Sequence, residues 1–349
     1  MTPAQAVDAA FSAVDTARDG LMRAAPGLFC AGTIAMAAQF LSANLGGPAM
    51  LFALLLGMSL NFLADDERCA TGLAWSSKNI LKIGVALLGA QITLTQVAAL
   101  GVPVIALVAV GVVFTIVAGA WIGRGVGLEK SHAVLTAGSV AICGASAALA
   151  ISSVLPRGEK LDQQTSLTVV GVTTLSTIAM ILYPLLARAF GFSDEQAGIF
   201  IGATIHDVAQ VVGAGYTISD EAGETAAIVK LMRVACLVPA VMAIAIISRK
   251  DRSANLPSEA APQLVPFFLI GFLAIMLANS IGLVTPTMTS VAAELSRWAL
   301  LMAVAALGVR TSIKAMGGLG AAPVMALVLQ TVALATLAAV GIVAIAVLA

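Results

Sequence analysis

The chain has 349 residues, of which 60% are hydrophobic and 10% charged, and its formal net charge is zero. A soluble domain carries about 25% charged residues, so this much apolar side chain cannot be hidden in one water-soluble core. The neutral balance and the lack of a basic stripe exclude nucleic acid as a partner. The composition therefore predicts an all-α, polytopic helical membrane protein that lies in the lipid bilayer.

The first 25 residues do not have the pattern of a signal peptide. Residues 1–25 carry charges such as Asp15 and Arg18 and have no apolar centre. Phe11 and Val14 belong to a helical apolar stripe. We expect an amphipathic cytoplasmic helix here, on the membrane surface or against the protein, and a frayed tail is the alternative.

The rest of the chain, 26–349, is predicted to form a transmembrane domain. Turn residues such as Gly46-Gly47-Pro48 separate its apolar segments, and the longest polar connection is 248–262. We predict about eleven transmembrane segments: 26–45, 48–64, 79–98, 102–123, 132–154, 165–188, 196–216, 225–247, 264–282, 291–309 and 321–348.

The positions of Lys and Arg predict the orientation of these segments. With a cytoplasmic N-terminus, most basic residues between segments fall on the cytoplasmic side, and only Arg157 and Lys160 fall outside. The C-terminus is then periplasmic. If 132–154 and 196–216 are both re-entrant, the overall topology is unchanged, so the charges do not separate the two models.

An internal duplication is indicated by two similar stretches. Val85-Ala86-Leu87-Leu88-Gly89 aligns with Val304-Ala305-Ala306-Leu307-Gly308, and Leu100-Gly101 then meets Leu319-Gly320. The third and tenth segments run in opposite directions, so the copies form an inverted repeat. We assign core segments to about 132–247 and scaffold segments to about 26–123 and 264–348.

The fifth segment contains small and polar residues around a glycine. A break at Cys143-Gly144 would leave free backbone N–H groups at Ala145 and Ser146, and such a helix start binds anions. Ser139 precedes this break and Ser146 adds a hydroxyl donor. An unbroken helix with a small-residue packing face is the alternative.

The seventh segment contains the central acid of the sequence. Ala197–Tyr216 is apolar but carries Thr204, His206, Asp207 and Gln210. Ionisable groups at membrane depth are costly and usually functional. This pattern predicts a second interrupted helix, in which Asp207 and His206 exchange a proton, because burial favours the neutral form of a carboxyl. A structural pair that bridges two helices is the alternative.

Basic residues supply the predicted positive charge. Lys230 and Arg233 share one face of the eighth segment. We expect Arg233 to pair with Asp207, with a carbonyl or with an anionic substrate. Arg310 aligns with Gln91 in the proposed repeat, and either a site role or snorkelling to the headgroups fits it.

The sequence predicts no metal or cofactor. No phosphate loop, dinucleotide fingerprint or paired-histidine motif is present. The four cysteines are far apart, without metal-ligand spacing, and we interpret them as reduced thiols.

Several stretches resemble the YeiH-type family of bacterial inner-membrane proteins, whose name indicates sulfate export. They are LKIGVALLGAQITL (81–94), AICGASAA (141–148), GATIHDVAQVVGAG (202–215), KLMRVACLVP (230–239) and LMAVAALGVRTSI (301–313). The resemblance covers about residues 25–349. It implies an all-helical carrier with crossed, interrupted helices, related in broad fold to cation/proton antiporters, and an inorganic sulfur oxyanion as cargo.

The sequence therefore predicts a secondary transporter that exports sulfate or sulfite, coupled to protons; a small organosulfonate fits nearly as well. The predicted substrate-binding residues are Ser139, Cys143, Gly144, Ala145, Ser146, Thr204, Gln210, Arg233 and Arg310. A homodimer formed through the scaffold is compatible with this arrangement. The alternatives are a passive anion channel and a membrane enzyme in which Ser146 or Cys143 pairs with His206.

Overall fold

The computed structural model describes residues 3–45, 49–156, 160–249, 267–311 and 320–348, and the side chains of 3–21, 249 and 348 lie outside this description. These residues are almost entirely helical, and no strand occurs among them. The chain forms two compact units, 1–84 with 297–311 and 85–296 with 312–349. Each unit is described by itself below.

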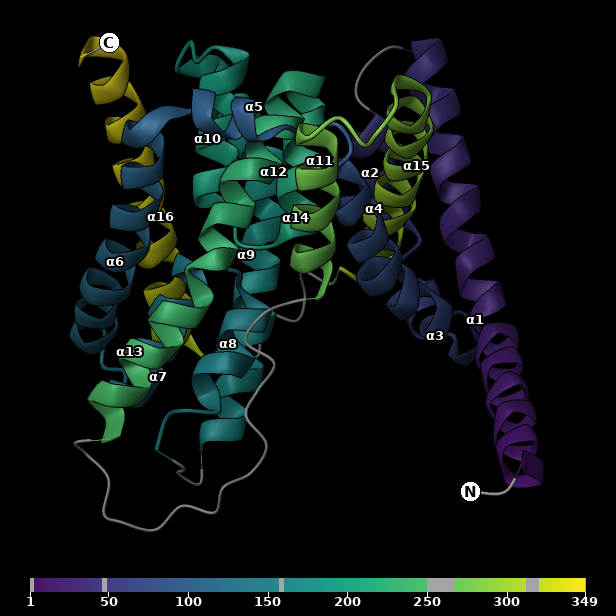
Figure 1. The fold of residues 1–349 in the computed structure, drawn as a ribbon. Helices are drawn as coiled ribbons and strands as arrows, with labels where there is room; N and C mark the ends of the chain where they lie inside the picture. The colour runs from purple at the N-terminus through teal and green to yellow at the C-terminus, as the bar shows by residue number, and fades with distance from the viewer. Residues whose placement is uncertain (1–2, 46–48, 157–159, 250–266, 312–319, 349) are drawn as a thin grey trace. The chain divides into compact units, whose positions relative to one another are not determined.

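The first unit is built around a long N-terminal helix (Figure 1). That helix, α1, is continuous from Pro3 to Leu45, and α2 and α3 pack against it. A helical run extends from Glu67 to Leu88. Asp66 caps its start, because the Asp66 side chain accepts a hydrogen bond from the Arg68 N–H. The elements are α1 (Pro3–Leu45), α2 (Ala49–Ser59), η1 (Asn61–Ala64), α3 (Glu67–Trp75), the π-helical turn η2 (Ser76–Ile80), the start of α4 (Leu81–Leu88) and the end of α15 (Pro286–Arg310).

The second unit contains the remaining helices. In it α6 packs against α7 and α16, and α12 packs against α10 and α11. Its elements are the end of α4, α5 (Leu94–Ala99), α6 (Gly101–Gly125), α7 (Lys130–Ala141), α8 (Ala145–Ser152), α9 (Leu161–Ala189), α10 (Asp194–Thr204), α11 (Val208–Ile218), α12 (Asp220–Ala235), α13 (Leu237–Arg249), α14 (Phe267–Ser280), the start of α15 and α16 (Ala321–Leu348).

The fifth predicted segment is broken and folds back on itself. Helix α7 ends at Ala141 and α8 begins at Ala145. The Ile151 side chain reaches Gly138, although a straight helix would separate these residues by about 20 Å. Lys130 before the break and Leu155 after it line the same groove. The α7–α8 segment is therefore a helical hairpin.

The seventh predicted segment forms a second hairpin. Helix α10 ends at Thr204 and α11 begins at Val208. Gly198 in α10 and Gly215 in α11 both lie against the Ala222 carbonyl of α12. These glycines can share that neighbour only if the chain reverses between them. Both interrupted helices thus fold back, which corrects the expectation of crossed helices and resolves the ambiguity that the charges had left.

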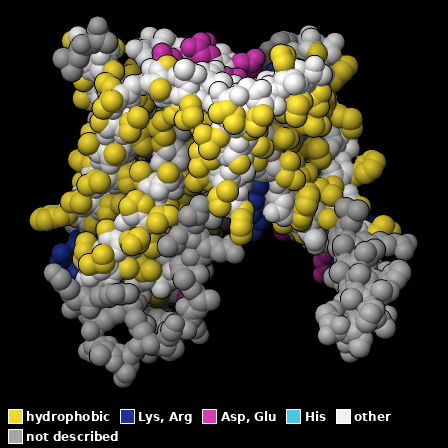
Figure 2. Space-filling model, viewed as in Figure 1, with side chains coloured by type: hydrophobic (Ala, Val, Ile, Leu, Met, Phe, Trp, Pro, Cys, Tyr) yellow, Lys and Arg dark blue, Asp and Glu magenta, His cyan; other side chains and the backbone are white. Residues whose placement is uncertain are grey.

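Apolar surface covers much of the described protein (Figure 2). Among the described residues, six helices are long and apolar enough to span a membrane: Met22–Leu45, Gly101–Gly125, Leu161–Ala189, Asp220–Ser248, Pro286–Arg310 and Ala321–Val347. A multi-pass helical membrane protein is thereby confirmed.

The third predicted segment, 79–98, is shifted toward the N-terminus, because the helical run begins at Glu67 and ends at Leu88.

Candidate functional site

The tips of the two hairpins meet inside the second unit. Gly144, at the first tip, has φ +58°, a conformation that L side chains rarely adopt. A Cβ placed on Gly144 would lie 3.4 Å from the Cβ of His206, which belongs to the second tip. Glycine therefore permits both the chain reversal and the close approach. Four helix ends converge here, namely the C-termini of α7 and α10 and the N-termini of α8 and α11.

Lys230 joins the two tips from α12. Its Nζ donates hydrogen bonds to the carbonyl of Ile142 at 2.6 Å and to that of Ile205 at 2.9 Å. The side chain has no exposed surface. Since Ile142 follows the last residue of α7 and Ile205 follows that of α10, one ammonium group serves the ends of both helices.

Arg233 lies one turn further along α12 and makes five hydrogen bonds to the same two ends. It donates to the carbonyls of Val140 and Ala141 in α7, at 2.8–3.1 Å. It also donates to Gly202 and Ile205 in the second hairpin, at 3.2 and 3.0 Å. Asp207, a carbonyl and an anionic substrate were the partners predicted for Arg233, and the structure shows backbone carbonyls.

These contacts explain why two cations are buried together. The last carbonyls of a helix have no partner within it and carry partial negative charge. Lys230 and Arg233 satisfy such carbonyls at two ends, so their own donors are also satisfied. The two basic side chains are thereby fixed at the end of the helix that precedes each break, and they hold the hairpins together.

Asp207 caps the start of α11. Its carboxylate oxygen accepts a hydrogen bond of 2.9 Å from the N–H of Ala209. His206 and Asp207 lie in the break between α10 and α11, and Gln210 lies in α11. As a whole residue, Asp207 is half-buried.

Helix α9 supports the second tip at its midpoint. The Ser176 hydroxyl accepts hydrogen bonds from the backbone N–H groups of His206, at 3.2 Å, and Asp207, at 3.1 Å. The Gln210 amide donates to the Thr177 hydroxyl at 2.7 Å. Ser176 is fifteen residues from Leu161 and thirteen from the other end of α9. The tips therefore lie about halfway along a helix long enough to span a bilayer.

His206 is held by α16. Its Nε2 lies 3.0 Å from the Thr331 hydroxyl, and the side chain is fully buried. Close to this contact, Gln330 donates to the Gly119 carbonyl and the Thr136 hydroxyl, at 2.8 and 3.0 Å. The imidazole thus belongs to a polar seam between α16 and the hairpins.

At the two tips, the helix N-termini, which belong to α8 and α11, are more accessible than the helix C-termini of α7 and α10. No side chain caps α8, and its second residue, Ser146, is exposed. Ala145, Asp207 and Val208 are half-buried. A small group that enters this part of the protein therefore meets the starts of α8 and α11, which carry partial positive charge.

The other predicted residues are placed differently. Ser139 and Thr204 are buried and donate to the Leu135 and Phe200 carbonyls of their own helices. Cys143 is buried at the first tip. Arg310 belongs to the first unit, where it donates to Ser77 at 2.7 Å, and its predicted role at the site stays a prediction.

Sequence reasoning missed Ser176, Thr177, Gln330 and Thr331. Their only sequence signal is that they are polar residues in apolar segments, and such residues commonly bond to their own helix.

Within the described parts of the chain, no group of three or more His, Cys, Asp or Glu could hold a metal ion.

Comparison with known proteins yields one family and many relatives. The model of the family described as conserved hypothetical protein 698 matches residues 26–327. The UPF0324 membrane protein TauZ of Paracoccus denitrificans is 51% identical over 93% of this chain and 96% of its own length. A UPF0324 membrane protein of Chlorobaculum tepidum is 46% identical over 89% of this chain and 87% of its own length. No solved structure matches the chain.

Proposed function

Because the chain belongs to the UPF0324 family of membrane proteins, which confirms the resemblance stated above, we propose that it is a secondary transporter of a small sulfur oxyanion. The observation that carries the proposal is the meeting of two helix N-termini, at α8 and α11, halfway along the spanning helix α9. Sulfite and sulfate are the candidate cargoes, and the proposed movement is export from the cytoplasm.

The charge arrangement supports an anion rather than a cation. The carbonyl-bearing ends of α7 and α10, which would attract a cation, are occupied by Lys230 and Arg233. The ends left accessible present backbone N–H groups and the Ser146 hydroxyl, which are donors. Donors of this kind bind anions.

Asp207 would couple anion binding to a proton. An ionised carboxylate at the start of α11 competes with an anion for the same N–H groups and repels it. A protonated carboxyl removes the repulsion and can donate to the anion. Anion and proton would therefore bind together, with His206 placed beside Asp207 to assist the proton exchange.

The proposed topology places the N-terminus in the cytoplasm and the C-terminus in the periplasm of an inner membrane. Taking the two hairpins out of the eleven predicted segments leaves nine crossings. The hairpins enter from opposite sides, and their tips meet at mid-depth, as expected for an alternating-access carrier. The inverted repeat remains part of this proposal.

We propose transport rather than hydrolysis for this chain. The enzyme alternative requires Ser146 or Cys143 to share a hydrogen bond with His206. The ring nitrogen Nε2 of His206 lies instead against Thr331. That contact favours a positioning role for His206 and supports the assignment as a non-enzyme.

The test is transport in proteoliposomes by wild type and Asp207→Asn. Asparagine keeps an N-cap oxygen for α11 and cannot release a proton. We expect wild type to accumulate labelled sulfite or sulfate when a proton gradient is imposed, and Asp207→Asn to exchange the anion without responding to the gradient.

The matched control is Glu195→Gln, which removes the charge of an exposed acid at the start of α10. This variant should behave as wild type. Gradient-driven accumulation by Asp207→Asn at the wild-type level would overturn the coupling role. Absence of saturable sulfite or sulfate transport by wild type would overturn the proposed cargo.

A further inference from the structure

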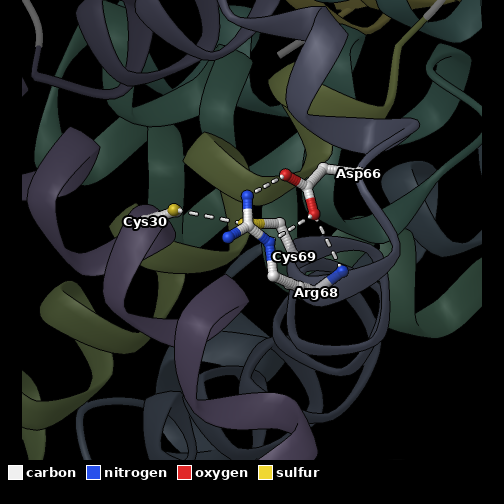
Figure 3. Close-up of polar contacts among 4 residues, drawn as sticks. All are labelled: Cys30, Asp66, Arg68 and Cys69. Atoms are coloured by element: carbon white, nitrogen blue, oxygen red, sulfur yellow. Dashed lines mark hydrogen bonds and ion pairs between the residues drawn. The ribbon is translucent and has the colours of Figure 1, made fainter.

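Two cysteines far from the hairpin tips in sequence lie face to face in the first unit. Cys30 of α1 and Cys69 of α3 are 39 residues apart, and their Sγ atoms are separated by 3.7 Å (Figure 3). Cys69 is buried and Cys30 is half-buried, and both are free thiols. A disulfide bond is about 2.05 Å long, so the two sulfurs need to approach by only about 1.6 Å.

The backbone contact between α1 and α3 makes that approach possible. A Cβ placed on Gly27 would lie 2.7 Å from the Cα of Gly72, and the reverse distance is also 2.7 Å. Cys30 follows Gly27 by three residues, and Cys69 precedes Gly72 by three. The cysteines therefore face each other one turn from the glycine contact, between antiparallel helices whose backbones touch. Disulfides require such short separations between the two Cα atoms.

The charged side chains next to Cys69 are bonded to each other. Arg68 binds Asp66 through two side-chain hydrogen bonds, of 3.2 and 2.9 Å, and Figure 3 shows this ion pair beside Cys69. The guanidinium is thus occupied, and each thiol has the other as its contact. Of the two, Cys30 is the more exposed on the protein surface.

We infer that Cys30 and Cys69 form a redox-active dithiol, which a small-molecule disulfide such as oxidised glutathione converts to an intramolecular disulfide. The Cys30 thiolate attacks one glutathione sulfur, forms a mixed disulfide and releases one glutathione thiolate. The Cys69 thiolate then attacks the Cys30 sulfur and releases the second. Both thiol protons pass to the two glutathione molecules, which take up the two electrons that the cysteines lose.

The bond ties the first spanning helix to α3 across the connecting helix α2. It joins residues that are 39 positions apart, and a crosslink over this separation restricts the unfolded chain. The redox state of the surrounding thiol pool would thereby set the stability of the first unit, independently of the chemistry at the hairpin tips.

The experiment uses the full chain with Cys143→Ser and Cys236→Ser, which leaves only this pair of cysteines. Membranes are equilibrated with mixtures of reduced and oxidised glutathione, blocked with a maleimide and digested for mass spectrometry. We expect a peptide pair linked through Cys30 and Cys69 that increases with the oxidised fraction, together with a joint loss of both maleimide adducts. Dithiothreitol should restore both adducts.

The control variant carries Cys30→Ser in the otherwise native chain, and it should yield no linked peptide that contains Cys69. The inference is overturned if wild-type Cys30 and Cys69 stay fully alkylated at the most oxidising ratio. It is also overturned if they form only separate glutathione adducts, or if Cys69 links to Cys143 or Cys236 in the Cys30→Ser chain.

Discussion

The Lys230 ammonium donates a 2.6 Å hydrogen bond to the Ile142 carbonyl, 88 residues away in the chain. Through its second bond, to Ile205, the same group reaches the other hairpin. A side chain of α12 therefore acts as a fixed internal cation between two interrupted helices. Both tips are held by these hydrogen bonds together with those of Arg233, and the first prediction concerns the removal of Lys230.

Replacing Lys230 with alanine should destabilise the tips. The Ile142 carbonyl loses its ammonium partner, while the Ile205 carbonyl keeps its hydrogen bond from Arg233. A buried polar group that is left without a partner costs about 1–3 kcal/mol. We expect a lower melting temperature in detergent and a partial recovery in methylammonium chloride, because methylammonium fits the vacated space and supplies the same donors. Tetramethylammonium has no N–H donor and should not help. Equal melting curves in the two salts would contradict this role.

Replacing Gly144 with alanine should impair anion binding more than folding. The φ of +58° costs an L residue about 1–3 kcal/mol, and the new methyl group would lie 3.4 Å from His206. The control is Gly127→Ala, which has φ +93° and no neighbour within 4 Å of the added Cβ. Both variants should melt earlier than wild type. Only Gly144→Ala should raise the half-saturating concentration of the anion in a transport assay.

Replacing Ser176 with alanine should loosen the second tip. The N–H groups of His206 and Asp207 both lose their acceptor, and an unsatisfied buried group costs about 1–3 kcal/mol. We expect faster amide hydrogen exchange at these two residues and slower transport. Ser166→Ala is the matched control, because Ser166 is exposed on the same helix and bonds only to its own Asp162 carbonyl. Unchanged exchange at the tip in Ser176→Ala would refute the supporting role.

Acidification should weaken the start of α3. The hydrogen bond from the Arg68 side chain, followed by that from the Arg68 backbone N–H, lowers the pKa of Asp66. The stabilising contribution of Asp66 is therefore complete above its unfolded pKa, about 3.9, and is lost as the pH falls through the lower folded pKa. Asp66→Ala should melt earlier than wild type at pH 7, and the difference should shrink toward pH 3. A difference that is constant across this range would show that Asp66 acts without its charge.

The sequence predicted where the helices break but not how the chain continues after each break. Gly144 and the polar residues His206 and Asp207 are poor in an uninterrupted membrane helix, so both breaks could be located from local chemistry. Whether α8 continues or reverses depends on contacts with distant residues, such as Ile151 with Gly138. The loop charges were compatible with either course, and sequence reasoning left both open.

The partners of the tips could be predicted only in part. Arg233 was expected at the site because a deep arginine needs acceptors, and carbonyls were among the partners considered. Ser176 could not be singled out, because many Ser and Thr side chains in α9 bond to their own helix, as Thr173 and Thr174 do. Its distinction is that two N–H groups from another segment lie opposite it, and this depends on the tertiary fold.

The position of Ser176 near the centre of α9 has a consequence for the proposed transport. From the second tip, roughly 20 Å of helix extends toward either end of α9. An ion arriving from either compartment would then travel a similar distance and desolvate to a similar degree before it reached the same donors. The path itself would favour neither compartment, so net flow would follow the concentrations of ion and proton on the two sides.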